Sequence, residues 1–216
     1  MATVTEAHET TAASNRMRII DAALACVTRS GTRKLTIDDI ASQAGVSRAT
    51  IYRTFDGGRD AILSAAVETE VARFFSTMAA AMGRAHDLSE LTVTMLTVSA
   101  TYLSNHQTLT FLRSHEPETV FTHLTFGRID ATLEAATSFA APFFVQWLEP
   151  EEASRAAELV VRIVVSHLTD PDPAFDLQDV AAVTAFVDTF VVAALVAPMA
   201  PRSRRIQKKQ EKGRSS

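Results

Sequence analysis

Residues 36–55 read TIDDIASQAGVSRATIYRTF, and the spacing of their apolar residues predicts two short helices joined by a tight turn. Gly45 lies at that turn, where a glycine adopts a positive φ without steric cost. Thr36 and Ser47 stand where the two helices begin, and each can accept hydrogen bonds from the first backbone N–H groups as an N-cap. The spacing of Ala41, Gly45 and Ile51 is typical of a helix-turn-helix, whose second helix enters the major groove of DNA.

The second helix leaves polar side chains away from its apolar face. Arginines can donate bidentate hydrogen bonds to guanine edges or bind phosphates, and an alanine can contact a thymine methyl group. Hydroxyl groups and the backbone N–H groups at helix starts suit phosphate oxygens. The predicted DNA contacts are Thr36, Ser47, Arg48, Ala49, Thr50, Tyr52, Arg53 and Thr54. The alternative is an ordinary three-helix packing unit with a solvated helix, and the joint occurrence of caps, glycine and spacing favours DNA binding.

The rest of the chain also has helical spacing, and no segment alternates as a strand does. Before the motif we expect a loose tail over 1–14 and a helix over 16–29 with Ser14 or Asn15 as N-cap. After it we expect helices over 59–82, 88–105, 107–115, 118–126, 128–148, 151–169 and 178–197. Pro142 should kink or end the helix that contains it. The predicted fold is all-α, with a three-helix head on a larger helical body.

Charge is unevenly distributed along the 216 residues, although the net charge is only −4. Residues 1–66 carry 8 Lys/Arg against 7 Asp/Glu, whereas residues 67–200 carry 6 against 17. Such a chain can present its head alone to a polyanion. Residues 201–216 carry 7 against 1 and form a basic, unpatterned segment, either a solvated tail or a source of nonspecific phosphate contacts.

Several classes of protein are disfavoured by the same sequence. The single cysteine, Cys26, excludes an intramolecular disulfide, and no apolar run is long enough to span a bilayer, so we expect a cytoplasmic protein without a membrane partner. No glycine-rich phosphate loop or nucleophile elbow is present, and the six histidines form no metal-binding spacing. We therefore expect no catalytic residues, no metal and no cofactor, and an α-helical enzyme is the disfavoured alternative.

Three strings carry a resemblance to a known family: LTIDDIA at 35–41, AGVS at 44–47 and TIYRTF at 50–55. They resemble the tetracycline-repressor (TetR) family of bacterial regulators over about residues 16–65. The resemblance implies a homodimeric transcription factor, usually a repressor, with an N-terminal DNA-binding domain and a C-terminal effector domain. The family often has His where Thr54 stands and a phosphate-binding Lys where Gly58 stands. Arg59 is the predicted replacement for that second contact.

Two C-terminal helices are too apolar to be covered on one side only. The segment 151–169 has one charged stripe, in which Glu151 and Glu158 each precede an arginine by four residues, and is otherwise widely apolar. The segment 178–197 is apolar almost all round. We predict that both pack against the same helices of a second subunit as an isologous four-helix bundle. The alternative is that both are central within one subunit.

Between head and dimer helices lie many Met and Phe residues, which can be ordinary core or can line a cavity for a bulky, apolar effector. The predicted ligand contacts are Met78, Met82, Met95, Phe111, His115, Phe143 and Trp147. The predicted divisions are a disordered tail at 1–14, a DNA-binding domain at 15–58, an effector-binding and dimerisation domain at 59–198 and a basic disordered tail at 199–216.

The sequence thus predicts a dimeric, ligand-responsive regulator that is released from a palindromic DNA operator by a small-molecule effector. An architectural DNA-binding dimer without an effector is the alternative.

Overall fold

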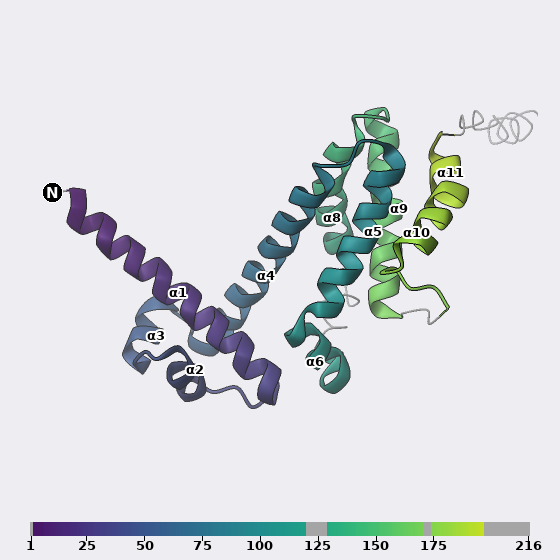
Figure 1. Cartoon of the computed structure of the whole chain (residues 1–216). Helices are drawn as coiled ribbons and strands as arrows, with labels where there is room; N and C mark the ends of the chain where they lie inside the picture. The colour runs from purple at the N-terminus through teal and green to yellow at the C-terminus, as the bar shows by residue number, and fades with distance from the viewer. Residues whose placement is uncertain (1, 120–128, 171–173, 197–216) are drawn as a thin grey trace, which may run out of the picture.

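The computed structural model describes residues 2–119, 129–170 and 174–196, and every regular element in these ranges is a helix (Figure 1). In chain order these are α1 (Ala2–Ser30), α2 (Ile37–Ala44), α3 (Arg48–Thr54), α4 (Gly58–Met82), α5 (Leu88–Asn105), α6 (Gln107–His115), α8 (Ile129–Phe144), α9 (Pro150–Thr169), α10 (Val180–Phe186), the π-helical η1 (Val187–Val192) and α11 (Ala193–Val196). The predicted all-α fold is confirmed. Most of the helix expected over 118–126 and the whole basic segment 199–216 lie outside the described residues.

The first helix is longer than the sequence pattern predicts. It was expected over 16–29, but α1 begins at Ala2, so the expected loose tail is wrong for residues 2–14 and neither Ser14 nor Asn15 is an N-cap. No glycine or proline precedes Gly31, and this stretch is rich in alanine, the best helix former. Apolar spacing indicates only the part of a helix that packs, which here begins near Ile19.

Helices α1, α2, α3 and the beginning of α4 share one hydrophobic core. Ile19, Ile40, Ile51 and Ile62 are fully buried in it, one from each helix. The core reaches as far along α4 as Ala66. The head is therefore completed by the first turns of α4, which run on into the rest of the molecule (Figure 1).

A second core lies in the body, where α8 and α9 pack against each other and α5 packs against α9 and α10. Small residues of α9, among them Ala153, Ala156 and Ala157, are fully buried at this packing. The α8 helix ends at Phe144 and does not continue to residue 148 as expected. The helix passes through Pro142, whose missing N–H and ring affect the preceding turn, and it ends two residues later.

The expected single helix over 178–197 is interrupted by a π-helical segment. It begins at α10, passes through η1 and finishes as α11. Val183, Val187 and Val191 are buried against the body core, whereas Val180 and Phe190 are exposed. One face of this helical segment is therefore covered within the subunit and the other is open.

Among the described helices, none combines the length and the apolar character needed to cross a membrane.

Candidate nucleic-acid interface and effector cavities

The start of α2 is held by a reciprocal pair of hydrogen bonds. Thr36 Oγ1 accepts from the Asp39 backbone N–H at 3.1 Å, and Asp39 Oδ2 accepts from the Thr36 backbone N–H at 3.2 Å. This is a complete capping box, as the sequence predicted. Asp38 and Asp39 both lie in the first turn, where negative charge is stabilised by the helix dipole.

The turn between α2 and α3 depends on Gly45, which has φ 63° and ψ 39°. Its left-handed conformation confirms the expected positive φ and lets its N–H bond to the last turn of α2. Arg18 of α1 donates to the carbonyl of Ala44 at 2.6 Å and so satisfies the last backbone acceptor of α2. The pair of helices is thus fixed at the turn by one arginine that the sequence pattern did not indicate.

The recognition helix α3 has a buried face and an open face. Ser47 caps it by accepting from the Thr50 backbone N–H at 3.1 Å. Ile51 is fully buried, and Phe55, just beyond the helix, is 3% exposed and carries the guanidinium of Arg16 over its ring. Packing of Ile51 and Phe55 on the head core sets the rotation of α3 about its own axis.

That rotation leaves most predicted DNA contacts at the surface. Exposed positions are Thr36, Ser47, Arg48, Ala49, Tyr52 and Arg53, whereas Thr50 and Thr54 are half-buried. Tyr52 is 52% exposed, so its ring and hydroxyl are accessible on the open face of α3. The Thr54 hydroxyl donates to the Thr50 carbonyl at 2.8 Å, so it is engaged within α3.

Two of the basic side chains already have partners in the free protein. Arg48 lies 3.3 Å from a carboxylate oxygen of Asp38, and both side chains are largely exposed. Arg59 donates to the Thr32 carbonyl at 3.4 Å and lies 3.3 Å from Asp60. Arg48 therefore exchanges an exposed ion pair for any DNA contact, which costs little because such pairs contribute about 0–1 kcal/mol. The DNA contacts stay predictions.

Five of the seven predicted ligand contacts share the body core, and the other two lie near the head. Met78, Met82 and Met95 are buried in the body core, with Phe143 and Trp147 packed against it. Phe111 instead lies beside Gly31 of the head, and the exposed His115 stacks on it with ring centroids 4.3 Å apart. None of these residues lines either of the cavities described below, so their role toward a ligand remains a prediction.

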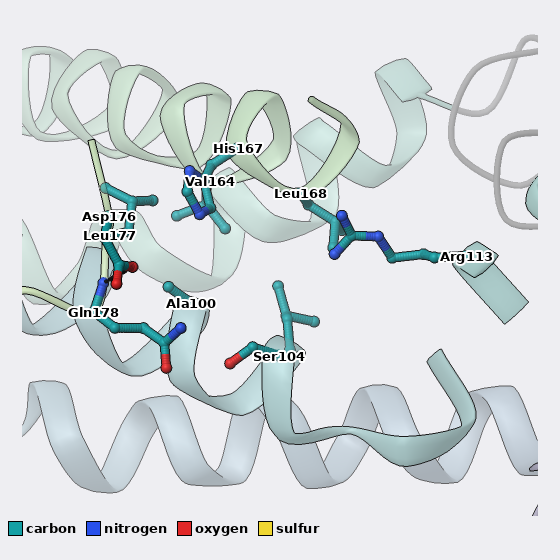
Figure 2. Close-up of a pocket in the computed structure, with 10 residues that line it drawn as sticks. Ala100, Ser104, Arg113, Val164, His167, Leu168, Asp176, Leu177 and Gln178 are labelled. Carbon is teal, nitrogen blue, oxygen red and sulfur yellow. Dashed lines mark hydrogen bonds between the residues drawn. The ribbon is translucent and has the colours of Figure 1, made fainter. Parts of the chain in front are cut away.

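Among the cavities in the described part of the body, two are more polar than the expected Met/Phe-lined site. The first, of about 360 Å³, lies between α5, α6, α9 and the segment before α10 (Figure 2). Its lining includes Arg113, His167, Asp176 and Gln178. The second, of about 570 Å³, is lined by hydroxyl and amide side chains of α4 and α5 with Gln178 and Val180. Sequence spacing could not indicate either, because their walls come from segments distant in the chain.

Head and body touch through α6. The hydroxyls of Thr28 and Thr108 are 2.8 Å apart, and Leu112 packs on the head core. Glu116 is buried, with its carboxylate accepting from the Thr32 hydroxyl and, at 3.2 Å, from the Thr32 backbone N–H.

The electrostatics of Glu116 favour its charged form. Burial raises the pKa of Glu116, but hydrogen bonds from the Thr32 hydroxyl and from the backbone of Thr32 and Arg33, with the Arg33 charge, outweigh that effect. The pKa therefore lies below its ordinary value. An ionised carboxylate thus joins the loop after α1 to the end of α6.

A second link runs from α1 to α4 and on to α6. Arg73 of α4 lies 3.0 Å from Asp21 of α1 and 2.6 Å from Glu70. Glu70 in turn lies 2.8 Å from His106 Nε2, and His106 Nδ1 accepts from the Leu109 backbone N–H as the N-cap of α6. The pKa of Arg73 is raised, chiefly by its hydrogen bond to Asp21.

Within the part of the chain that the structure describes, no cluster of three His, Cys, Asp or Glu residues could hold a metal ion.

Known proteins resemble the chain in two ways. Residues 19–66 match the family of bacterial regulatory proteins of the tetR family. Solved structures share the fold: the TetR family repressor AlkX from Dietzia sp. strain DQ12-45-1b is 24% identical with TM-score 0.54, covering 80% of this chain and 92% of its own. FadR from Bacillus subtilis, in complex with stearoyl-CoA, is 18% identical with a TM-score of 0.57. The match covers 80% of this chain and 97% of the FadR chain. A SmeT–triclosan complex is 18% identical with TM-score 0.54, covering 87% and 96%.

No curated protein matches the chain significantly. The matched residues 19–66 coincide with the head core, which begins at Ile19 and ends at Ala66. Residues 19–66 therefore form a helix-turn-helix domain that matches the tetR family of bacterial regulatory proteins, and the chain shares its overall fold with solved structures that include the TetR family repressor AlkX.

Proposed function

We propose that the protein is a dimeric, ligand-responsive repressor of the cytoplasm that leaves a palindromic operator when a small, largely apolar effector binds. The observation that carries this proposal is the open face of α3, with Arg48, Ala49, Tyr52 and Arg53 exposed on a helix whose opposite face is fixed by Ile51. We propose residues 15–58 as the DNA-binding unit and 59–198 as the effector-binding and dimerisation unit, with α4 passing between them.

The open face of α3 suits the major groove. Arg48 and Arg53 supply the forked donors that read guanine, and Tyr52 with Thr50 supplies hydroxyls for phosphates. Thr36 and Ser47 place helix N-termini, whose N–H groups favour anions, at the same surface. In a dimer two such helices roughly 34–36 Å apart would read successive major grooves of a palindrome.

The open faces of the last helices support dimerisation. Phe190 is 65% exposed, although Val183, Val187 and Val191 of the same segment are buried; Val180, the first residue of α10, is 57% exposed. Leu159 on α9 is also exposed. The charged stripe of α9 is present, with Arg162 2.7 Å from Glu158 and Arg155 paired with Glu151. The exposed apolar residues favour a second copy as their cover over a central position of both helices within one subunit.

An effector is supported by the cavities and by the solved relatives. Those solved structures hold stearoyl-CoA, which joins an apolar acyl chain to a polar, anionic coenzyme A, and triclosan, which is apolar and aromatic. The cavities here have the size of small-molecule sites, which run from about 300 to 1,000 Å³.

The route from body to head is short. Arg113 of α6 lines the first cavity. Leu112, adjacent to it, and Glu116, three residues later, contact the head. An effector that binds more tightly when α6 has one placement relative to the head than when it has another would shift the spacing of the two heads in the dimer. Moving the population from mostly bound to mostly free DNA requires roughly 10⁴-fold differential affinity. Helix α4, tied to α1 through Arg73, would carry the same displacement.

The test measures binding of the protein to duplex DNA from the region upstream of its own gene. Binding is detected by fluorescence anisotropy at several salt concentrations. We expect salt-sensitive binding that Arg48→Ala weakens by about 1–3 kcal/mol and Tyr52→Phe weakens less. Arg84→Ala, an exposed arginine just beyond α4, is the matched control and should bind normally. Size-exclusion chromatography should show the same dimer for all four proteins. Absence of salt-sensitive affinity, or equal affinity of wild type and Arg48→Ala, would contradict the proposal.

A further inference from the structure

The first cavity contains a cationic side chain without a partner. Arg113 extends from α6 into the space between α5, α9 and the segment before α10 (Figure 2). Within the described ranges it forms no ion pair and donates no hydrogen bond, in contrast to Arg33, Arg48 and Arg73. A guanidinium is planar and presents paired donors that match a carboxylate, so an unpaired arginine in a cavity favours an anionic ligand.

The other walls are mixed: five of the nine remaining lining residues are apolar, and the polar ones are Ser104, His167, Asp176 and Gln178. Leu103 of α5, Val164 and Leu168 of α9 and Leu177 line the cavity, and Ser104 is the polar group contributed by α5. A volume of about 360 Å³ lies at the lower end of the range of about 300–1,000 Å³ for small-molecule sites. The cavity therefore suits a small ligand with one charged end and an apolar body.

A carboxylate in the cavity limits the ligand to one negative charge. Asp176 lies across the cavity from Arg113 in Figure 2, and its Oδ1 accepts from the Gln178 backbone N–H at 2.8 Å. A second anionic group would approach this carboxylate and be repelled. We propose that the effector of this protein is an organic monocarboxylate whose carboxylate binds Arg113 and whose apolar body contacts Val164, Leu168 and Leu177. The proposal rests on the proposed function and adds the chemical class of the effector.

The test compares octanoate with n-octanol and octylammonium, which have the same chain with a neutral or a cationic end. Binding to the full-length protein is measured by isothermal titration calorimetry, without DNA. We expect octanoate to bind best, and Arg113→Gln to weaken octanoate binding about tenfold or more while leaving n-octanol binding unchanged. Arg84→Gln is the matched control, because it removes an exposed arginine that does not line the cavity.

A second variant keeps the test independent of folding defects. Asp176→Asn retains an oxygen that can accept from the Gln178 N–H, and it removes the charge that faces the ligand. We expect this variant to bind octanoate more tightly than wild type, which a damaged cavity would not do.

Two outcomes overturn the inference: equal octanoate binding by wild type and Arg113→Gln, or no binding of any straight-chain monocarboxylate from butanoate to dodecanoate. Operator binding is measured separately on the same proteins. If the protein fails to bind any DNA duplex but binds octanoate through Arg113, then the proposed function fails and the ligand class stands. If it binds DNA but Arg113→Gln leaves octanoate affinity unchanged, then only the ligand class fails.

Discussion

One residue at the contact between head and body, Glu116, is expected to make the stability of the protein depend on pH. Glu116 is buried and accepts hydrogen bonds from Thr32, and its pKa lies below the ordinary value. A carboxyl whose pKa is depressed in the folded state stabilises that state above its unfolded pKa. This contribution is lost as pH falls through the folded pKa.

We therefore expect Glu116→Gln to lower the free energy of unfolding at pH 7 by about 1–3 kcal/mol, because a charge-assisted hydrogen bond to a buried group is lost. The difference between wild type and variant should shrink as pH falls below the ordinary glutamate value of 4.5, since wild-type Glu116 then becomes protonated. Urea unfolding of both proteins at a series of pH values measures this difference in the free energy of unfolding.

Glu134→Gln provides the control, because Glu134 is exposed on α8. A difference for Glu116→Gln that persists unchanged to pH 3 would show that the charge of Glu116 is not the stabilising factor.

The residues that the sequence could predict are those whose role is local. Thr36, Gly45 and Ser47 act on backbone groups within a few positions, so their roles were visible in the sequence and are confirmed. Arg18 and Glu116 bond to backbone groups 26 and 84 positions away, which no local pattern encodes. Arg113 was missed for the same reason, because the other walls of its cavity come from distant segments.

At the scale of elements, α2 depends on its cap to an unusual degree. It has only 8 residues, and isolated helices of that length are unstable in water. The Thr36 hydroxyl accepts the Asp39 backbone N–H, which otherwise has no partner in the first turn of the helix.

We expect Thr36→Ala to destabilise the free protein by about 1 kcal/mol, through loss of the capping hydrogen bond. Thr36→Ser, which keeps the hydroxyl, should restore most of the stability. Thermal unfolding without DNA separates this effect from any contact of Thr36 with phosphate. Equal melting temperatures for Thr36→Ala and Thr36→Ser would argue against the cap.

Elements were predicted well where caps or breakers mark their ends, and less well elsewhere. The bounds of α5 and α6 agree with the expected 88–105 and 107–115, since Asp87 and His106 cap them. The extension of α1 to Ala2 was missed because an unpacked helical stretch has no apolar spacing. The π-helical turn of η1 was missed because the same valines fit an ordinary α-helix.

At the scale of the whole molecule, the last helical segment of the described chain exposes apolar side chains, which the proposed dimer would cover. Phe190 is 65% exposed on η1, with Val180 exposed at the start of α10. Burial of such a ring against a second copy would contribute about 1.5–3 kcal/mol per copy, which a charged side chain would reverse.

We expect Phe190→Glu to be monomeric by multi-angle light scattering and to bind operator DNA far more weakly, because one head contacts only half of a palindrome. Val145→Glu, at an exposed apolar position just after α8, should remain dimeric. A Phe190→Glu protein that is still dimeric at micromolar concentration would place the interface elsewhere.

Gly31 ends α1 with φ 83°, and a methyl group at this position would overlap the carboxylate of Glu116. A β-carbon at position 31 would require the Glu116 side chain to move, and the move would disturb the hydrogen bonds by which Glu116 joins the head to the end of α6. Gly31 is neither a predicted DNA contact nor a wall of either cavity. Substitution of Gly31 is therefore expected to strain the backbone at its positive φ and to loosen the contact between the head and α6, without altering a predicted DNA contact or a cavity wall.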